Sequence, residues 1–219
     1  MKNIIIFGSG DHAKVIFWEL VEFKKYKIIG FFDYTKKERI LINYKNKIYK
    51  SFSSYKKINK ISNLHGIIGL GTGSLRKEFL INTQKAKLNI TWEKFISKFA
   101  VIKKNVKLDD GCVILSGSHI NSNSIIGKHV LINSKCNVEH DNIIDDFVTL
   151  SPSVTTAGNV KIGLGTYIGM GSCILNNTKI KNNVIVGAGS LVNKNLSSNN
   201  MYFGSPAKKI RGIKKKDRF

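Results

Sequence analysis

The second half of the chain repeats a pattern of small and apolar residues every six positions. From Ala100 onward, sixteen six-residue units follow one another without an insertion. The first position of a unit is small or β-branched except at Asn142, and the third is aliphatic except at Thr156. Because alternate side chains of a strand share a face, both positions are expected to point inward.

Three such units would close one triangular coil of 18 residues, and stacked coils pair their backbones. Residues 18 apart then lie above one another, which predicts a parallel β-helix over residues 96–198 with a continuous apolar column. Glycine recurs at the corners, for example at Gly127 and Gly163, where tight backbone is needed. Cys136 begins a unit and is expected in the core.

The first 95 residues follow another pattern, in which apolar runs alternate with helical periodicity. Strands are expected at residues 4–7, 28–32 and 66–70, with helices over 13–24 and from about 75. This alternation predicts a short Rossmann-like parallel sheet. The fold class is therefore α/β plus all-β: a Rossmann-like domain at 1–95, a parallel β-helix at 96–198, and a tail at 199–219.

A glycine turn, Gly8-Ser9-Gly10, joins the first strand to the first helix and can direct backbone N–H groups at an anion. The domain supplies only half of a dinucleotide fold, so a mononucleotide fits better than a dinucleotide. Asp33 follows the second strand and can accept hydrogen bonds from a base or ribose, or serve as a turn acid. His12 is a ligand contact or a surface residue, and His65 is expected in a loop.

The charge, the hydropathy and the cysteine content argue against several classes of protein. The net charge is +22, but the lysines are spread along the whole chain, which favours a compositional bias over a nucleic-acid patch. No apolar window is long enough for a membrane span. Three cysteines without CxxC spacing argue against a disulfide scaffold and a zinc ribbon. The expected location is cytoplasmic, with neither nucleic acid nor membrane as partner.

The histidines in the repeat region differ in the position that each occupies within its six-residue unit. His140 is the fifth residue of its unit, at a corner, beside Asp141, which can orient it as a general base. Gly158 is 18 residues later and should lie directly above His140, where its N–H can meet a developing oxyanion. His119, His129 and His140 occupy positions two, six and five of their units and should point in different directions, so no metal is expected.

Motifs along nearly the whole chain resemble one family of hexapeptide-repeat acyltransferases, the bacterial sialic acid O-acetyltransferases and UDP-4-amino-sugar N-acetyltransferases. These motifs are Phe7–His12, Phe31–Asp33, Gly71–Lys77, Asn133–Asp141, Ala157–Gly163 and Gly204–Lys208. The resemblance implies a left-handed β-helix, a homotrimer, acetyl-CoA as cosubstrate and a nucleotide-linked amino sugar as acceptor.

Residue roles follow from the same resemblance. It implies that Gly10, His12 and Asp33 bind the nucleotide, that His140 deprotonates the acceptor, and that Asp141 pairs with His140. It implies that Asn133 contacts the acceptor group and that the amide of Gly158 faces the acetyl carbonyl. Thr149 stands where many members carry a second histidine near the acetyl group. The resemblance places the turn Gly204–Lys208 near coenzyme A, where Lys208 can meet the phosphates; otherwise this turn is a structural lid over the last coil. By charge alone, the basic run Lys214–Lys216 could also help to hold such an anion.

Two alternative functions are compatible with the same six-residue repeat. A sialic acid O-acetyltransferase would need no nucleotide pocket, and a trimeric β-helix scaffold would need no catalytic site at all. The preferred hypothesis is acetyl transfer to the amine of a UDP-linked 4-amino-4,6-dideoxy-sugar, with His140 as the base.

Overall fold

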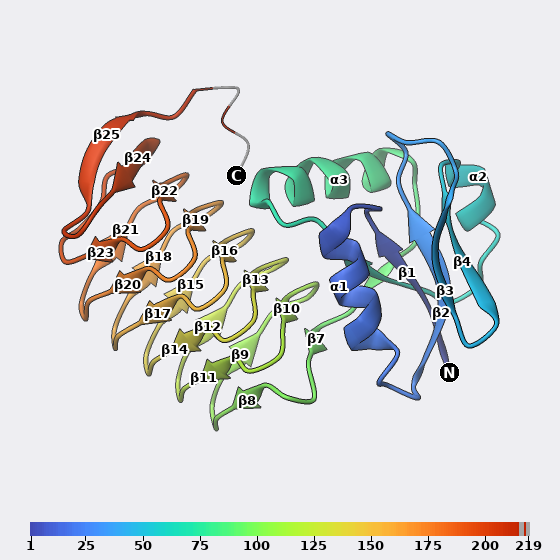
Figure 1. Cartoon of the computed structure of the whole chain (residues 1–219), viewed down its shortest axis with the longest axis horizontal. Coiled ribbons are helices and arrows are strands. Elements are labelled where there is room, and N and C mark those ends of the chain that lie inside the picture. Colours follow the sequence, from blue (N-terminus) through green and yellow to red (C-terminus); the bar gives the residue numbers. More distant parts are fainter. Residues whose placement is uncertain (215–216, 218–219) are drawn as a thin grey trace. The chain divides into compact units, whose positions relative to one another are not determined.

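The computed structural model describes residues 1–214 and Asp217. The chain divides into two compact units (Figure 1). The first contains residues 1–71 and 76–93, and the second contains residues 72–75 and 94–219. Lys215 and Lys216 of the basic tail lie outside the described residues.

The first unit is built on one six-stranded sheet in the order β3-β4-β2-β1-β5-β6. All neighbouring strands are parallel except β3 and β4, which form an antiparallel hairpin. The parallel sheet expected from the sequence is confirmed. The strands are β1 (Lys2–Phe7), β2 (Tyr26–Phe32), β3 (Ile40–Tyr44), β4 (Lys47–Phe52), β5 (Leu64–Ile68) and β6 (Thr91–Trp92); the helices are α1 (Asp11–Leu20), α2 (Tyr55–Ile58) and α3 (Gly73–Lys85).

Aromatic packing holds this sheet together. Phe7, at the end of β1, is fully buried and meets the rings of Phe32, Phe79 and Trp92 edge-on. Such pairs add about 0.5–1.5 kcal/mol each beyond the area they bury. The end of β1 is therefore a rigid point, and the glycine turn that follows it starts from a fixed position.

Two local expectations for this unit need correction. His65 was expected in a loop, but it lies within β5, is 6% exposed and places its Nδ1 2.7 Å from Glu93 Oε1. The parallel strand begins two residues earlier than Gly66, because Leu64 and His65 already pair with β1. The β3–β4 hairpin was not anticipated at all.

The second unit is a left-handed parallel β-helix, as expected. Its three parallel faces contain strands of two residues, and each strand pairs with the one 18 residues later, as Val113 does with Leu131. The first face contains β7 (Phe95–Ile96), β10 (Val113–Ile114), β13 (Leu131–Ile132), β16 (Thr149–Leu150), β19 (Tyr167–Ile168) and β22 (Ile185–Val186), and a hairpin of β24 (Asn200–Phe203) and β25 (Lys208–Gly212) extends it.

The second and third faces complete the triangle. The second contains β8 (Val101–Ile102), β11 (His119–Ile120), β14 (Asn137–Val138), β17 (Thr155–Thr156), β20 (Cys173–Ile174) and β23 (Leu191–Val192). The third contains β9 (Lys107–Leu108), β12 (Ile125–Ile126), β15 (Ile143–Ile144), β18 (Lys161–Ile162) and β21 (Lys179–Ile180).

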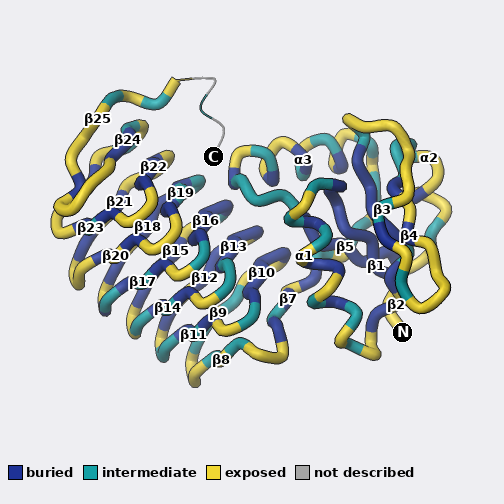
Figure 2. The backbone as a smooth tube through the Cα atoms, in the orientation of Figure 1, coloured by how far each residue is buried: buried dark blue, intermediate teal, exposed yellow. Residues whose placement is uncertain are grey.

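The inward positions of the coils form the apolar column. Aliphatic residues of the third positions, such as Ile114, Ile132 and Leu150, are fully buried, whereas exposed residues gather at the turns (Figure 2). The two exceptions to the repeat, Asn142 and Thr156, are also fully buried. Both polar side chains therefore sit inside the helix rather than escaping to solvent.

One corner of the helix carries a column of asparagines. Asn105, Asn123, Asn159 and Asn177 all have φ near +60°, and Asp141 occupies the same place in its coil with φ 59°. Asn and Asp tolerate this left-handed conformation better than other side chains do. The corner thus fixes the backbone of Asp141 in the conformation that its neighbours above and below share.

Among the described residues, no helix has the length and apolar character needed to cross a membrane.

Candidate active site

His140 and Asp141 form an ion-pair-type contact at the corner that follows β14. Nδ1 of His140 lies 2.7 Å from Oδ2 of Asp141, and both side chains are about half exposed. Asn123, one coil earlier, donates to Oδ1 of Asp141 at 3.2 Å. The hydrogen bond from His140, followed by that from Asn123, lowers the pKa of Asp141 below its ordinary value. Asp141 is therefore ionised at neutral pH and orients the imidazole.

Gly158 lies against the ring of His140. A Cβ atom built on Gly158 would stand 2.5 Å from Cε1 and 2.7 Å from Nε2 of His140. The backbone of Gly158 is outside the left-handed region, so the ring and not the φ angle demands glycine here. Gly158 therefore lies beside the imidazole of His140 in the next coil, as the 18-residue period predicts.

Glu139, on the other side of His140, is held by two amides. Asn121 donates to Oε2 at 2.9 Å and Asn137 donates to Oε1 at 3.0 Å. The hydrogen bonds from Asn137 and Asn121 are the main reasons that the pKa of Glu139 lies below its ordinary value. His140 is therefore flanked in the sequence by two ionised carboxylates, those of Glu139 and Asp141. Of these two, the carboxylate of Asp141 contacts the imidazole.

Three other residues predicted for the site lie elsewhere on the helix. Asn133 is at the corner that follows β13, where its Oδ1 accepts from the N–H of Ser134. Thr149 is buried in β16 on the first face, beside Leu131 and Tyr167. Lys208 is exposed at the start of β25. Within one chain, none of them joins the corner of His140.

The glycine turn of the first unit is held by Asp33. Oδ2 of Asp33 accepts from Ser9 Oγ at 2.6 Å, and Oδ1 accepts from the N–H and Oγ1 of Thr35. Burial alone would raise the pKa of Asp33, but the hydrogen bonds from Ser9 and Thr35 outweigh it and the pKa is lowered. Three donors leave room for about one more on the carboxylate. Asp33 thus orders the turn and retains one acceptor position.

Gly10 and His12 begin the helix after this turn. Gly10 is the N-cap of α1, and a Cβ atom built on it would meet nothing within 4 Å. Nε2 of His12 is buried and has no hydrogen-bond partner among the described residues. Burial, aided by the charge of Arg76, lowers the pKa of His12 to about 4, so the ring is neutral at neutral pH.

Sequence reasoning missed three residues that support these sites. Ser9 contacts Asp33, Asn123 contacts Asp141, and the guanidinium of Arg76, which is 2% exposed, donates to the carbonyls of Leu70 and Gly71. Asn123 carried a signal, since it lies 18 residues before Asp141 in a corner column of asparagines.

The remaining histidines and cysteines of the helix have other environments. His119 lies in β11 on the second face, while His129 is 3% exposed and stacks on Phe147. Among the described residues, no three His, Cys, Asp or Glu side chains are grouped to hold a metal ion. Cys136 is in the core as predicted, where burial raises the pKa of its thiol to about 12.

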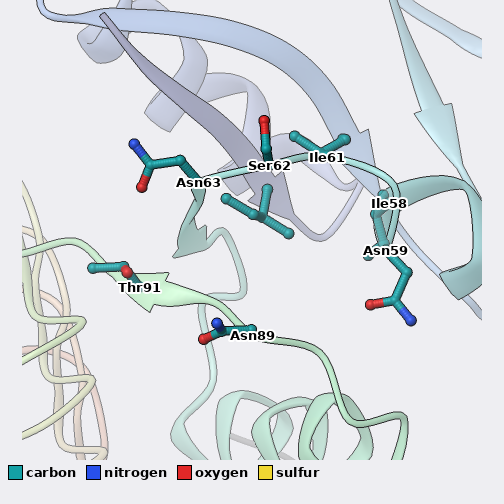
Figure 3. A pocket seen from close by; sticks show the side chains of 8 residues that line it. Ile58, Asn59, Ile61, Ser62, Asn63, Asn89 and Thr91 are labelled. Atoms are coloured by element: carbon teal, nitrogen blue, oxygen red, sulfur yellow. The ribbon is translucent and has the colours of Figure 1, made fainter.

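A pocket of about 240 Å³ lies at the end of the first unit's sheet that is opposite to the glycine turn (Figure 3). Its walls come from the loop before β5 and from the start of β6, and they include Asn59, Ser62, Asn63, Asn89 and Thr91. The glycine turn and Asp33 follow the carboxyl ends of β1 and β2, whereas this pocket is at the amino end of β5. It contains no ionisable side chain and none of the predicted site residues.

Comparison with curated proteins gives a partial match. The chain is 32% identical over 100 residues to the mitochondrial gamma carbonic anhydrase 1 of Arabidopsis thaliana. The match covers 45% of this chain and 35% of the relative, so it spans about a third of the relative's length.

Solved structures match nearly the whole chain. The acetyltransferase domain of PglB from Neisseria gonorrhoeae, in complex with acetyl coenzyme A, is 23% identical with a TM-score of 0.85, covering 95% of this chain and 99% of that one. A variant of perosamine N-acetyltransferase from Caulobacter crescentus, bound to CoA and GDP-perosamine, is 23% identical with a TM-score of 0.86 and coverage of 96% and 97%. Residues 3–82 match the family model of the PglD N-terminal domain. The chain therefore has the fold of these acetyltransferases and begins with a region that matches the PglD N-terminal domain.

Proposed function

We propose that the protein transfers the acetyl group of acetyl-CoA to the amine of a nucleotide-linked sugar. The observation that supports this most is the corner where His140 is paired with Asp141 and its ring lies against Gly158. The shared fold adds support, because the similar structures are named as acetyltransferases and contain acetyl coenzyme A or CoA with GDP-perosamine.

The base in this proposal is Nε2 of His140. The Nδ1–H of the ring donates to the carboxylate of Asp141, which leaves the lone pair of Nε2 free to accept a proton. As the sugar amine attacks the thioester carbonyl, a C–N bond forms and Nε2 takes a proton from the nitrogen. Asp141 stabilises the imidazolium that results. The C–S bond then breaks, and the thiolate of coenzyme A takes up the proton on leaving.

The oxyanion in this proposal is met by the N–H of Gly158. The carbonyl oxygen of the thioester becomes negatively charged in the tetrahedral intermediate, and a fixed backbone donor stabilises it. Removing one such donor commonly costs about 10²–10³ in rate. Because Gly158 has no side chain, the thioester can approach its amide and the imidazole together.

The acceptor's nucleotide is assigned to the first unit. Its phosphates would meet the backbone N–H groups at Gly10 and the start of α1, beside His12, and its ribose or base would use the remaining acceptor position of Asp33. A UDP-linked 4-amino-4,6-dideoxy-sugar is the acceptor we propose. GDP is the first alternative base, because a similar structure contains GDP-perosamine.

A homotrimer is part of the proposal. Thr149 lies on the first face and Asn133 at its corner, whereas His140 lies at the corner after the second face. These residues can serve one site only if the neighbouring chain supplies some of them. We therefore place the site between adjacent copies, with Lys208 and the basic tail near coenzyme A, and expect the protein in the cytoplasm.

The test is release of coenzyme A thiol over a panel of UDP-, GDP- and dTDP-linked amino sugars. Wild-type protein should release thiol with at least one of them, and His140→Ala should lower kcat at least about 10²-fold, as expected for loss of a general base. Unchanged transfer by His140→Ala would remove this histidine from the mechanism. Matched circular dichroism spectra of the two proteins provide the folding control.

The same panel distinguishes the alternatives. A rise in Tm with UDP or GDP supports a nucleotide-linked acceptor, whereas no rise together with transfer to free sialic acid would support O-acetylation. Absence of any acetyl transfer together with an intact oligomer would support the scaffold.

A further inference from the structure

Asn142 breaks the rule for the first position of the repeat, where the other units carry small or β-branched residues. We propose that Asn142 is a positioning residue for acetyl transfer: it holds the peptide that presents the Gly158 N–H and ties it to the backbone of His140. This inference rests on the function proposed above for the same corner.

The side chain of Asn142 lies inside the coil, beneath the catalytic corner, and is fully buried. Its Nδ2 lies 2.6 Å from the carbonyl oxygen of Glu139, 3.2 Å from that of His140 and 3.0 Å from that of Ala157. The two N–H groups of the amide therefore serve three carbonyls, with one hydrogen shared between two of them. Two of these carbonyls belong to the coil of His140, and the third belongs to the coil of Gly158. One amide group therefore connects the backbones on which the base and the oxyanion donor are mounted.

The contact with Ala157 sets the direction of the Gly158 N–H. The carbonyl of Ala157 and the N–H of Gly158 belong to the same peptide group, which is trans, so the two point in opposite directions. Asn142 holds the carbonyl toward the interior of the coil. The N–H consequently points outward, to the side of the corner where the thioester would bind, and no hydrogen bond among the described residues occupies it.

Hydroxyl side chains at the first position make only part of this arrangement. Ser124 donates to the carbonyl of Glu139, and Thr166 donates to that of Lys181, in each case 15 residues later. Asn142 makes the same 15-residue bond to Ala157 and adds the two bonds within its own coil. The added bonds are found at the corner that carries His140, and a serine or threonine cannot make them with its single donor.

Stability is a poor explanation for an asparagine here. Oδ1 of Asn142 is buried without a hydrogen-bond partner among the described residues, and an unsatisfied buried acceptor destabilises the folded state. Val160 occupies the same position one coil later and is fully buried. A valine would therefore fit the core at position 142 without leaving a polar oxygen unpaired.

The experiment compares Asn142→Val, Asn142→Ser and the control Thr166→Val in steady-state acetyl transfer. Asn142→Val should lower kcat about 10- to 100-fold with KM for both substrates within about twofold, because a misdirected donor acts mainly on the transition state. Asn142→Ser, which can restore the bond to Ala157 but not the bonds within its own coil, should recover kcat only in part. Thr166→Val removes an equivalent core hydroxyl away from the corner and should leave kcat within about twofold of wild type.

A second measurement is independent of activity. In protein labelled with ¹⁵N-glycine, the amide cross-peak of Gly158 is identified by its loss in Gly158→Ala. Asn142→Val should shift this cross-peak, and Thr166→Val should leave it in place. Wild-type kcat in Asn142→Val, or an unmoved Gly158 cross-peak, would overturn the inference.

The two proposals fail in different ways. If wild-type protein transfers no acetyl group to any acceptor, the proposed function fails, and the Gly158 cross-peak alone then decides whether Asn142 holds this peptide. If wild-type protein is active and Asn142→Val is equally active, the function stands and only the role of Asn142 is lost.

Discussion

Gly158→Ala perturbs the proposed site through a single methyl group. The added Cβ would stand 2.5 Å from Cε1 of His140, whereas carbon atoms pack best at about 3.5–4.0 Å. The ring must therefore retreat by about 1 Å or more. The half-exposed His140 side chain can do so easily, but it then departs from its 2.7 Å contact with Asp141.

The expected loss follows from that displacement. A misplacement of about 1 Å in an active site costs on the order of 10²-fold in rate, which corresponds to about 2.7 kcal/mol in the activation free energy. The stability of the folded protein should increase, in contrast to the rate. Gly158 lies outside the left-handed region, so alanine is accepted by the backbone and should raise the free energy of unfolding by about 0.4–1 kcal/mol.

Thiol release measures kcat, and thermal unfolding measures stability, for four proteins: wild type, Gly158→Ala, His140→Ala and the double variant. If the methyl group acts by displacing the imidazole, Gly158→Ala should have little further effect once His140 is alanine. Gly158→Ala with more than a third of wild-type kcat would refute the reasoning. An equally large effect of the methyl group in the His140→Ala background would show that it acts elsewhere.

Two further predictions concern titration and thiol chemistry. The pKa of His12 is lowered to about 4 by burial and by Arg76, so between pH 6.5 and 4 the unfolded chain binds a proton that the folded chain does not. Acidification from pH 7 to 5 should therefore reduce the free energy of unfolding by roughly 2 kcal/mol at this residue, and chemical denaturation of His12→Asn should show a smaller loss. Cys173 is exposed while Cys112 and Cys136 are buried with thiol pKa values raised to about 12, so a thiol reagent should modify Cys173 alone in folded protein. All three should react after denaturation, and a folded Cys173→Ser variant that still reacts rapidly would contradict this assignment.

The β-helix could be predicted almost residue by residue because its interior imposes one strict period. A coil has room for a small residue and then an aliphatic one on each face, so the phase alone places His140 at a corner and Gly158 beside it. The same phase marks Asn142 and Thr156 as exceptions. What Asn142 does could not be predicted, because its partners lie in two coils and the reach of an amide is visible only in three dimensions.

The first unit was predicted less completely. Strands β1, β2 and β5 contain apolar runs, whereas lysines interrupt β4. β3 is itself apolar over its first three residues, and that short run was overlooked. Lys45 and Asn46, both with positive φ, make the hairpin turn, and only Asn46 was a residue type that suggests one. His65 was misplaced because its polarity outweighed its position next to a buried strand, whereas Glu93, distant in the sequence, satisfies its Nδ1.

The stacking of successive coils also limits how this protein can change its length. A single residue inserted between Asp141 and Gly158 would rotate every later side chain to a new place on the triangle and separate the glycine from the imidazole. Duplicating or deleting one whole coil on the C-terminal side of Asn177 would leave both groups facing each other. Longer or shorter versions of this protein can thus be engineered in steps of one coil, with the chemistry left in place while the end of the helix moves.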